Sequence, residues 1–474
     1  MKVKTIPILL YDSLDKRKKQ FIPIEKGKVK IYVCGPTTYD KSHIGHARVY
    51  VFFDLVRRFL ECIGYKVDLV VNITDIDDKI IRRGNEEFEG NWQKVLYKYN
   101  KDFLDMLEKL KIKRPTIICE VTKHIQEIIE FIGDLIKKRY AYVAEDGVYF
   151  HVPAFKEYGK LSGVNIQDPK IHRIEPSPYK KHPADFALWK FWKEGEPYWY
   201  SPWGKGRPGW HIECSAMASK YLGDRIDIHG GGADLIFPHH ENEIAQSEAK
   251  FGHRWVNFWM HVGLVYYKGR EMSKSIKNFV LVDEVLDKYP PEVLRFYILY
   301  HHYRKPMEFD WESLKTAYNS WKKIVDAYFK ILAYKKMEKY SNTSHIKDSL
   351  DKIIENIIEK LANDFDTVNA LNHIIEGSNI ILRQKEFSKE DINKALEFFN
   401  TIEAIFGILP VDILSDKLEY LLDLIVEIRN KLRSRKLYEL SDEIREKLKK
   451  VGIELKDIDS TSYYTIIVEE LLSK

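Results

Sequence analysis

The chain has no long hydrophobic run, and only four of its 474 residues are cysteine. No apolar stretch approaches the ~20 residues that cross a membrane. The apolar run near the start, residues 6–10, is interrupted by a proline and is shorter than the ~7 residues of a signal-peptide core. We therefore expect a cytoplasmic protein without a membrane partner. In that compartment the cysteines are predicted to be thiols or metal ligands rather than disulfides.

The sequence also lacks a large excess of either charge. Its 76 Lys and Arg against 71 Asp and Glu leave a net charge of +5, which permits a polyanionic partner without requiring one. Hydrophobic residues make up 45% and charged residues 31%, a composition typical of folded globular proteins. No repeat of fixed period is present, which argues against a solenoid.

Glycine and proline almost disappear after residue 310. Residues 311–474 contain only three of the 24 glycines, Gly377, Gly407 and Gly452, and one of the 17 prolines, Pro410. This last third is therefore predicted to be nearly all helix, an all-α bundle. Its apolar residues agree, because they recur at intervals of three and four. One such series is Leu418, Leu421, Leu422, Ile425, Ile428 and Leu432.

Residues 1–310 instead alternate short strand-like runs with helical patterns. A predicted strand at 28–33 is followed by a helix at 47–62 and a second strand at 67–72. This order predicts a right-handed βαβ unit within a Rossmann-like α/β fold, whose parallel sheet binds ligands at the carboxyl ends of its strands. Residues 122–200 break the rhythm with a helix at 124–139 and a hairpin at 140–150, and we interpret them as an insertion.

Two histidines stand where the first predicted helix begins. His43 and His46 lie in the segment 37–48, and a helix N-terminus favours phosphate through its unpaired N–H groups and its dipole. Both imidazoles can donate to phosphate oxygens, and Gly45, which has no Cβ, lets a flat base lie on the backbone. Taken alone, the pattern fits a capping or packing role for one of the histidines equally well.

A polar loop at residues 269–278 carries one central lysine, Lys274. By itself, such a loop is typical of a solvated surface turn.

Side chains that can bind a metal occur at three places in the sequence. His239 and Glu243 are four residues apart at the start of a helical run, so they project from one face and form half of a metal site. Cys34, at a strand end, and Cys214 can complete a tetrahedral set of the kind that zinc accepts. The spacing also allows two buried cysteines and a histidine that caps a helix. The other two cysteines have no such context and are predicted to pack in the core.

Taken together, the histidine pair and the segment Met272-Ser273-Lys274-Ser275 resemble the signature of the class I aminoacyl-tRNA synthetases. Further stretches narrow the resemblance to the cysteinyl-tRNA synthetases. These stretches are residues 32–37, 72–79, 185–190, 206–217 and 227–243, and they lie in order across nearly the whole predicted catalytic part.

The resemblance implies a metal centre and a nucleotide site. It implies that the zinc ligands are Cys34, Cys214, His239 and Glu243. Zinc bound there would distinguish the thiol of cysteine from the hydroxyl of serine by ligand chemistry. The catalytic residues implied are His43, His46 and Lys274, which would stabilise charge on the phosphates of ATP in the presence of Mg²⁺. The implied ATP-binding residues are Gly45, Gly230, Gly231, Gly232, Met272, Ser273, Lys274 and Ser275.

The resemblance also implies a substrate pocket formed by Gly35, Thr74, Trp210, His229 and Asp234. Two of these residues have a simpler interpretation. Thr74 with Asp77 fits a capping pair at a helix N-terminus, and Trp210 fits a core residue.

A basic stripe at residues 429–436 lies in the predicted helical region. Such runs are typical of solvated helix faces. Similarity to the family's anticodon-binding bundle instead implies that Arg429, Arg433 and Arg435 contact tRNA phosphates. Tyr463 and Tyr464 fit either base stacking or core packing.

Two residues depart from the family pattern in the loop at residues 269–278, which we call the signature loop. Glu271 occupies a position that is usually lysine, and Lys277 one that is usually glycine. Arg270, beside the first change, is a candidate to replace the missing cation.

The resemblance thus implies a class I cysteine–tRNA ligase that forms cysteinyl-adenylate from ATP and L-cysteine and charges tRNA(Cys). It divides the chain into a first catalytic half (1–121), an insertion (122–200), a second catalytic half (201–310) and an anticodon-binding domain (311–474). Two alternatives remain. One is a related ligase that passes cysteine to an amino sugar and lacks the helical domain, and the other is an inactive paralogue that binds RNA. The oligomeric state stays open, with a monomer favoured.

Overall fold

The computed structural model describes residues 6–167, 177–272, 278–338, 340–410, 416–458 and 461–466. They form two compact units. The first unit comprises residues up to 108 together with 112–264 and 303–306, and the second comprises 109–111, 265–302 and the residues from 307 onward. Among the described residues, no helix combines the length and the apolar character that a membrane crossing needs.

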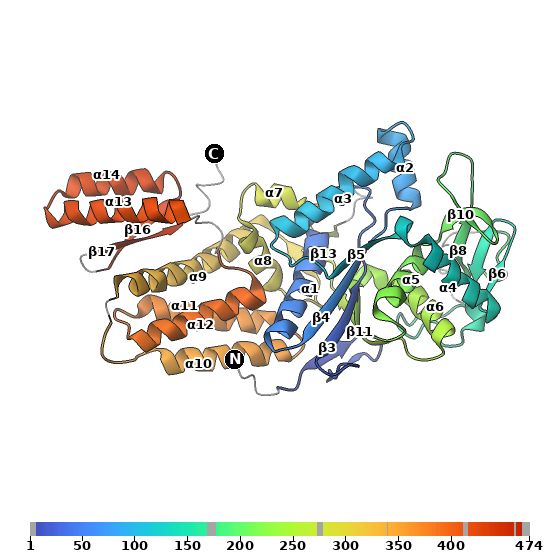
Figure 1. Ribbon diagram of the computed structural model, residues 1–474, viewed down its shortest axis with the longest axis horizontal. Helices are drawn as coiled ribbons and strands as arrows, with labels where there is room; N and C mark the ends of the chain where they lie inside the picture. The colour runs from blue at the N-terminus through green and yellow to red at the C-terminus, as the bar shows by residue number, and fades with distance from the viewer. Residues whose placement is uncertain are drawn as a thin grey trace. The chain divides into compact units, whose positions relative to one another are not determined.

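A parallel sheet of five strands lies at the centre of the first unit. Its order is β12-β11-β3-β4-β5. The strands are β3 (Lys28–Val33), β4 (Lys66–Ile73), β5 (Ile117–Glu120), β11 (Ile226–Gly232) and β12 (Val256–Val262). Helix α1 (Ile44–Cys62) lies on one side of the sheet, and α5 (Trp210–Leu222) and α6 (Glu241–Phe251) lie on the other (Figure 1). The predicted βαβ unit is confirmed, although α1 begins three residues earlier than predicted because His43 caps it.

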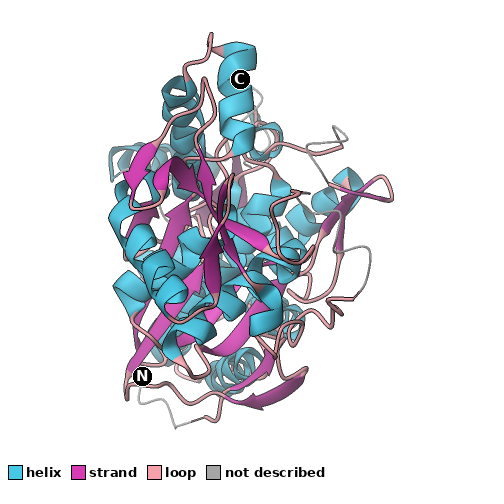
Figure 2. Ribbon diagram, turned by 90° about the vertical axis from the view of Figure 1, so that its right-hand side faces the viewer, coloured by secondary structure: helices cyan, strands magenta, loops and turns pink. Residues whose placement is uncertain are grey.

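An antiparallel sheet of five strands lies between β5 and β11 in the sequence. Its order is β6-β7-β8-β10-β9, and Figure 2 views the molecule from the side on which this sheet lies. Its strands are β6 (Ala141–Val143), β7 (Gly147–Phe150), β8 (Phe186–Phe191), β9 (Trp199–Ser201) and β10 (Gly204–Pro208). The predicted hairpin forms its first two strands, and the sheet extends eight residues beyond the predicted end of the insertion at residue 200.

The first unit also contains a hairpin and three α-helices. They are β1 (Leu9–Asp12), β2 (Arg17–Gln20), α2 (Asp78–Glu87), α3 (Trp92–Lys109) and α4 (Ile125–Lys137).

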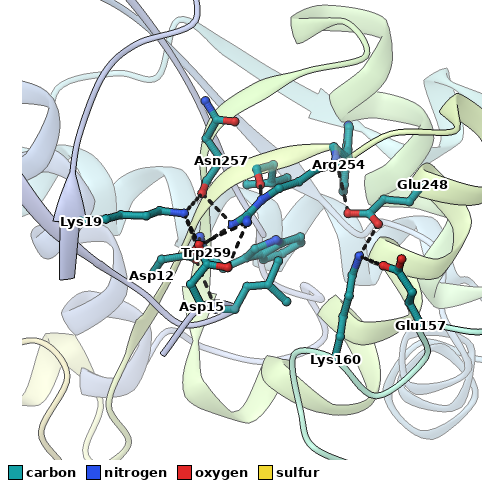
Figure 3. Close-up of polar contacts among 12 residues, drawn as sticks. Asp12, Asp15, Lys19, Glu157, Lys160, Glu248, Arg254, Asn257 and Trp259 are labelled. Atoms are coloured by element: carbon teal, nitrogen blue, oxygen red, sulfur yellow. Dashed lines mark hydrogen bonds and ion pairs between the residues drawn. The ribbon is translucent and has the colours of Figure 1, made fainter. Parts of the chain in front are cut away.

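A buried aspartate joins the β1–β2 hairpin to strand β12. The Asp12 carboxylate accepts hydrogen bonds from Lys19 Nζ (2.7 Å), Arg254 Nη2 (2.6 Å) and the N–H of Trp259 (2.9 Å) (Figure 3). Because a buried carboxylate is costly without partners, these two cations and the strand amide fix the hairpin on the sheet.

The second unit is mainly helical. Its helices are α7 (Val282–Leu286), α8 (Pro291–Leu299), α9 (Trp311–Met337), α10 (Lys347–Ala362), α11 (Thr367–Arg383), α12 (Lys389–Phe406), α13 (Asp416–Ser434) and α14 (Tyr438–Lys449). A small sheet consists of β13 (Val265–Tyr267), β14 (Arg270–Glu271) and β15 (Met307–Phe309). The helices predicted from the scarcity of glycine and proline are therefore present.

The last described residues form a hairpin, not a helix. Strand β16 (Ile453–Ile458) pairs antiparallel with β17 (Thr461–Ile466), so the expectation of helix is wrong here. Buried Ile453 and Leu455 alternate with half-buried Glu454 and Lys456, a period of two that favours a strand. In β17, Tyr463 is 9% exposed, and Tyr464 packs against the small core beneath α13. The structure thus supports core packing for both tyrosines.

One buried carboxylate ties α10 to α12. Asp391 accepts hydrogen bonds from the N–H groups of Ile346 (3.0 Å) and Ser388 (3.0 Å) and from the hydroxyl of Ser344 (2.8 Å). Burial alone would raise the pKa of Asp391, but these hydrogen bonds lower it to about 2.

We expect Asp391 to make the stability of the helical unit dependent on pH in the acid range. An unfolded aspartate has a pKa of about 3.9, so the contribution is complete above that pH and is lost as pH falls toward 2. Asp391→Asn should lower the free energy of unfolding by about 2–3 kcal/mol at pH 7 and remove this acid step. Urea titrations followed by helical circular dichroism at pH 7 and pH 3 measure both. Glu390→Gln, a neighbour with an exposed carboxylate, is the control and should change stability by less than about 0.5 kcal/mol.

Candidate active site

Four buried side chains converge on one point in the first unit. Cys34 follows β3, Cys214 lies in α5, His239 precedes α6 and Glu243 lies in its first turn, and their ligand atoms are all within 4.8 Å of one another. Cys34 Sγ is 3.8 Å from Cys214 Sγ and 3.4 Å from Glu243 Oε1. His239 Nε2 is 3.1 Å from Glu243 Oε1. The structure therefore brings together the four residues that the sequence suggested, and the cluster can hold a metal ion.

The charges of this cluster compensate one another. Burial alone would raise the pKa of Glu243, but the charges of His229 and His239 hold it well below its ordinary value. Burial opposes protonation of His239, yet the charges of Glu243 and Cys214 raise its pKa to about 10. Burial also opposes ionisation of Cys214, but a hydrogen bond from Cys34 and the charge of His239 lower its pKa to about 6. Without a metal, Cys214 and Glu243 are therefore anionic beside a protonated His239, and burial keeps Cys34 a thiol because it raises the pKa of Cys34 well above its ordinary value. A metal ion that binds to all four residues would displace the protons of His239 and Cys34.

Two histidines of this site were not predicted from the sequence. His240 Nε2 lies 3.3 Å from Cys34 Sγ, and His240 Nδ1 lies 2.7 Å from Nε2 of His261 on β12. Burial lowers the pKa of His240 well below its ordinary value and that of His261 to about 3. Both rings are therefore neutral. The pair of adjacent histidines at 239–240 is the sequence pattern that could have predicted His240 as a site residue. The sequence around His261 offers no such pattern.

Three of the predicted pocket residues contact a member of the cluster or the residue that precedes one of its members in the sequence. His229, fully buried on β11, places Nε2 3.3 Å from Glu243 Oε2. Half-buried Trp210 lies against His239 with 4.4 Å between ring centroids, so it borders the cluster and is not a core residue. The hydroxyl of Thr74 donates to Glu213 (3.0 Å). The capping interpretation of Thr74 is therefore wrong.

The other two predicted pocket residues lie at strand ends. Gly35 follows Cys34, and its N–H donates to Asn72 Oδ1 (2.7 Å). A Cβ at Gly35 would lie 1.4 Å from the carbonyl oxygen of Asn72, so only glycine fits where β3 and β4 end side by side. Asp234 has an exposed side chain in the turn after β11.

Both histidines of the first motif cap α1. His43 Nδ1 accepts from the N–H of Gly45 (3.1 Å), and His46 Nδ1 accepts from the N–H of His43 (3.2 Å). Their rings stack with centroids 3.9 Å apart. The capping alternative is therefore correct for both residues. Because each Nδ1 accepts a hydrogen bond, each neutral ring carries its proton on Nε2, so capping leaves a donor nitrogen in each ring.

The predicted ATP-binding residues are only partly described. A Cβ on Gly230 would lie 2.0 Å from the ring of Phe53, so this glycine lets α1 pack on the sheet. Gly231 and Gly232 complete β11. Met272 is buried, and its N–H donates to the carbonyl of Val265 (2.8 Å). Ser273, Lys274, Ser275 and Lys277 lie outside the described residues.

The three predicted tRNA-binding arginines differ in exposure. Arg429 is fully buried, donates to Asp457 Oδ1 (2.6 Å) and contacts Ser462. It joins α13 to the β16–β17 hairpin, so the prediction that it contacts tRNA is wrong. Arg433 lies 3.4 Å from Asp457 with a side chain 30% exposed, and Arg435 is exposed.

A carboxylate beside the metal cluster anchors the segment 157–162. Glu241, fully buried in the first turn of α6, accepts from the N–H groups of Gly159 (2.8 Å), Leu161 (3.1 Å) and Ser162 (2.7 Å). Because Glu241 lies between His239 and Glu243 in the sequence, this anchor also holds the start of α6, which lies between these two candidate ligands.

Comparisons with known proteins identify the class. The family described as "tRNA synthetases class I (C) catalytic domain" matches residues 20–319. The fold is similar to that of a Mycobacterium tuberculosis methionyl-tRNA synthetase in complex with methionyl-adenylate, with a TM-score of 0.61 and 14% identity over 84% of this chain and 94% of that one. It is also similar to an Agrobacterium radiobacter K84 LeuRS-tRNA-LeuAMS ternary complex, with a TM-score of 0.64 and 9% identity over 82% and 85% of the two chains. The fold and the family match define a class I tRNA synthetase.

Curated relatives narrow this class to one family. The chain is 49% identical to the cysteine–tRNA ligase of Pyrococcus horikoshii over 464 residues, which cover 94% of this chain and 97% of that protein. It is 47% identical to the cysteine–tRNA ligase of Thermococcus gammatolerans, over 95% and 97% of the two chains. The chain belongs to the cysteine–tRNA ligase family.

We expect Glu241→Gln to loosen the segment 157–162. The amide NH₂ replaces one acceptor oxygen and leaves at least one buried N–H without a partner, which costs about 1–3 kcal/mol. Hydrogen exchange at the amides of residues 159–162 should therefore become faster, and the free energy of unfolding should fall. Glu157→Gln is the control, because this carboxylate lies in the same segment but is 67% exposed. Unchanged exchange rates in Glu241→Gln would contradict the anchoring role.

Proposed function

We propose that the chain activates L-cysteine with ATP, forming cysteinyl-adenylate and pyrophosphate, and then transfers cysteine to the 3′-terminal adenosine of tRNA(Cys). The observation that carries this proposal is the buried cluster of Cys34, Cys214, His239 and Glu243 in a chain of the cysteine–tRNA ligase family. The alternative ligase that uses an amino sugar was expected to lack the helical region, and helices α9 to α14 argue against it.

We propose that the cluster binds zinc. Two sulfurs, one imidazole and one carboxylate are ligands typical of zinc, and bonds of about 2.0–2.3 Å in a tetrahedron separate ligand atoms by about 3.3–3.8 Å. The separations of 3.8 Å between the two sulfurs and 3.4 Å between Cys34 and Glu243 agree with this geometry. When bound, zinc would supply a soft Lewis acid that takes the substrate thiolate as a further ligand and binds the hydroxyl of serine less well.

The chain's own residues would bind and orient the reactants. Trp210, which lies against His239, forms a wall beside the thiol, and Thr74, held by Glu213, offers a polar contact to the aminoacyl group. Gly35, His229 and Asp234 complete the proposed pocket. The cysteine carboxylate attacks the α-phosphorus of ATP in line, and pyrophosphate leaves. This step requires no covalent nucleophile and no general acid or base from the protein.

Stabilisation of phosphate charge is assigned to the start of α1 and to the signature loop. The capping of α1 directs Nδ1 of His43 and His46 to the backbone and leaves Nε2–H as the donor to a phosphate oxygen. The positive end of the α1 dipole adds to this attraction. Lys274 and a Mg²⁺ ion that accompanies ATP would neutralise charge that grows as the leaving group departs.

We propose that Arg433 and Arg435 contact the tRNA backbone, with residues 311–474 as the tRNA-binding part. Support comes from the side-chain exposure of both arginines near the carboxyl end of α13.

The metal proposal predicts one zinc ion per chain. Cys214→Ser should lose the metal and at least about 100-fold in the rate of cysteine-dependent ATP–pyrophosphate exchange, because cysteine would lose its thiolate-specific contact. Metal content by elemental analysis and the exchange assay measure the two effects separately. Cys119→Ser is the matched control, since this buried cysteine lies outside the metal cluster. Normal cysteine activation after complete removal of metal would refute the proposal.

The tRNA proposal predicts different effects for neighbouring arginines. Arg435→Ala should weaken tRNA binding modestly and reduce the slope of log K against log salt by about one, as expected for one lost phosphate contact. Arg433→Ala should do less, because Asp457 already neutralises part of its charge. Arg429→Ala should leave that slope unchanged and instead lower the free energy of unfolding by about 3 kcal/mol, since it breaks a buried ion pair. Equal slopes for Arg435→Ala and the parent would show that the stripe is a solvated face.

A further inference from the structure

Helix α3 supports the loop that leads into α1. Residues 34–43 join β3 to α1 and end at the cap of α1. Asp102 on α3 accepts a hydrogen bond from the N–H of Ser42, with 2.7 Å between Oδ2 and the nitrogen. Asn100 on the same helix contacts the hydroxyl of buried Thr38. Helix α3 therefore holds this loop at two points.

Ser42 is the residue immediately before the cap of α1. His43 caps the helix, and its own N–H donates to Nδ1 of His46 (3.2 Å). Two successive N–H groups, those of Ser42 and His43, are therefore held by side-chain acceptors, first a carboxylate and then an imidazole. A rotation of the backbone at Ser42 would move the N–H of His43 away from His46. It would thus release the ring whose Nε2–H is assigned to a phosphate oxygen.

Packing of α3 against α1 fixes the position of Asp102. Its neighbour Phe103 is 1% exposed and meets the ring of Tyr50 edge to face, with 5.0 Å between the centroids. Tyr50 lies in α1, and its hydroxyl donates to the carbonyl of Cys34 (3.2 Å). Adjacent residues of α3 thus support the start of α1 and, through Tyr50, the strand end that carries a candidate zinc ligand. A carboxylate on such a packed segment has little freedom to follow a loop that moves.

The chemistry proposed for the two histidines depends on a support of this kind. Hydrogen-bond donors stabilise charge that grows in a transition state when they are already in place. A misplacement of about 1 Å can cost about 100-fold in rate. An ionised acceptor also makes a stronger hydrogen bond than a neutral one. Ser42 is only 8% exposed, so water does not readily replace Asp102 as the acceptor.

We propose that Asp102 is a positioning residue for the formation of cysteinyl-adenylate. It holds the N–H of Ser42 and so keeps Nε2–H of His43 and His46 directed at the phosphate site. The inference rests on the proposed function, because it assumes that these two histidines stabilise phosphate charge. It gives a part in the reaction to α3, which contains none of the residues predicted to form the site.

Two substitutions at Asp102 test this role in the full chain loaded with zinc. Asp102→Leu keeps the bulk of the side chain but removes the acceptor. It should lower the rate of cysteine-dependent ATP–pyrophosphate exchange at saturating substrates about 10- to 100-fold. The KM for ATP should change by less than about threefold, because the lost support acts on charge that develops in the transition state. Asp102→Asn keeps one acceptor oxygen and should stay within about threefold of the parent rate.

A double variant tests whether Asp102 acts through the histidines. In a chain that already carries His46→Ala, Asp102→Leu should lower the exchange rate by less than about threefold further, because residues that act as a unit are not additive. A full 10- to 100-fold loss in this background as well would show that Asp102 acts elsewhere, and would overturn the inference.

The control is a carboxylate on the same helix. Glu108→Leu removes an exposed carboxylate from α3 and should leave the exchange rate unchanged. Zinc content and thermal unfolding show that each variant is folded, and Asp102→Ala, with the same expectation, replaces Asp102→Leu if leucine prevents folding. A folded variant that lacks the acceptor but keeps the parent rate overturns the inference, and so does an equal loss in Asp102→Asn. Absence of exchange in the parent chain would instead refute the proposed function.

Discussion

The first unit depends on one constraint, the burial of two thiols, an imidazole and a carboxylate within a few ångströms of one another. Glu243 and His239 offset each other's charge at 3.1 Å, and Cys34 and Cys214 approach to 3.8 Å. Buried ionisable groups are tolerated only when they are paired or bind a cation. The elements that carry them, the end of β3, α5 and the start of α6, therefore have to meet with little freedom, and the parallel sheet provides the frame on which they meet.

Side-chain hydrogen bonds hold each of these elements in place. The start of α6 is anchored by Glu241 on the segment 157–162. The end of β3 is joined to β4 through Gly35 and Asn72, and α5 is joined to the residue after β4 through Glu213 and Thr74. Each of these contacts lies next to a candidate ligand in sequence, so a rotation of any one element would disturb both its own hydrogen bonds and the cluster.

Periodicity in the sequence predicted the elements but not their long-range contacts. Strand β3 was predicted with its observed bounds, and α1 and β4 to within three residues, because their apolar residues follow the periods of helix and strand. The hairpin at 453–466 was not predicted from the sequence. The scarcity of glycine and proline favours helix, and the alternating apolar pattern that favours a strand is only a few residues long. The burial of Arg429 could not be foreseen either, since its partner Asp457 lies 28 residues away. His261 joins the cluster only through the pairing of β12 with β11.

In the first motif, a structural role and the proposed chemical role belong to the same side chains but to different ring nitrogens. The sequence left capping and phosphate binding as alternatives for His43 and His46, and the structure shows that both residues cap α1. Capping engages Nδ1, which assigns the proton of a neutral ring to Nε2. A donor whose tautomer is already fixed by the backbone needs no rearrangement when charge develops on a phosphate, and such preorganisation is the main source of electrostatic catalysis. The cap is therefore a condition for the chemistry proposed here rather than a competing explanation of the motif.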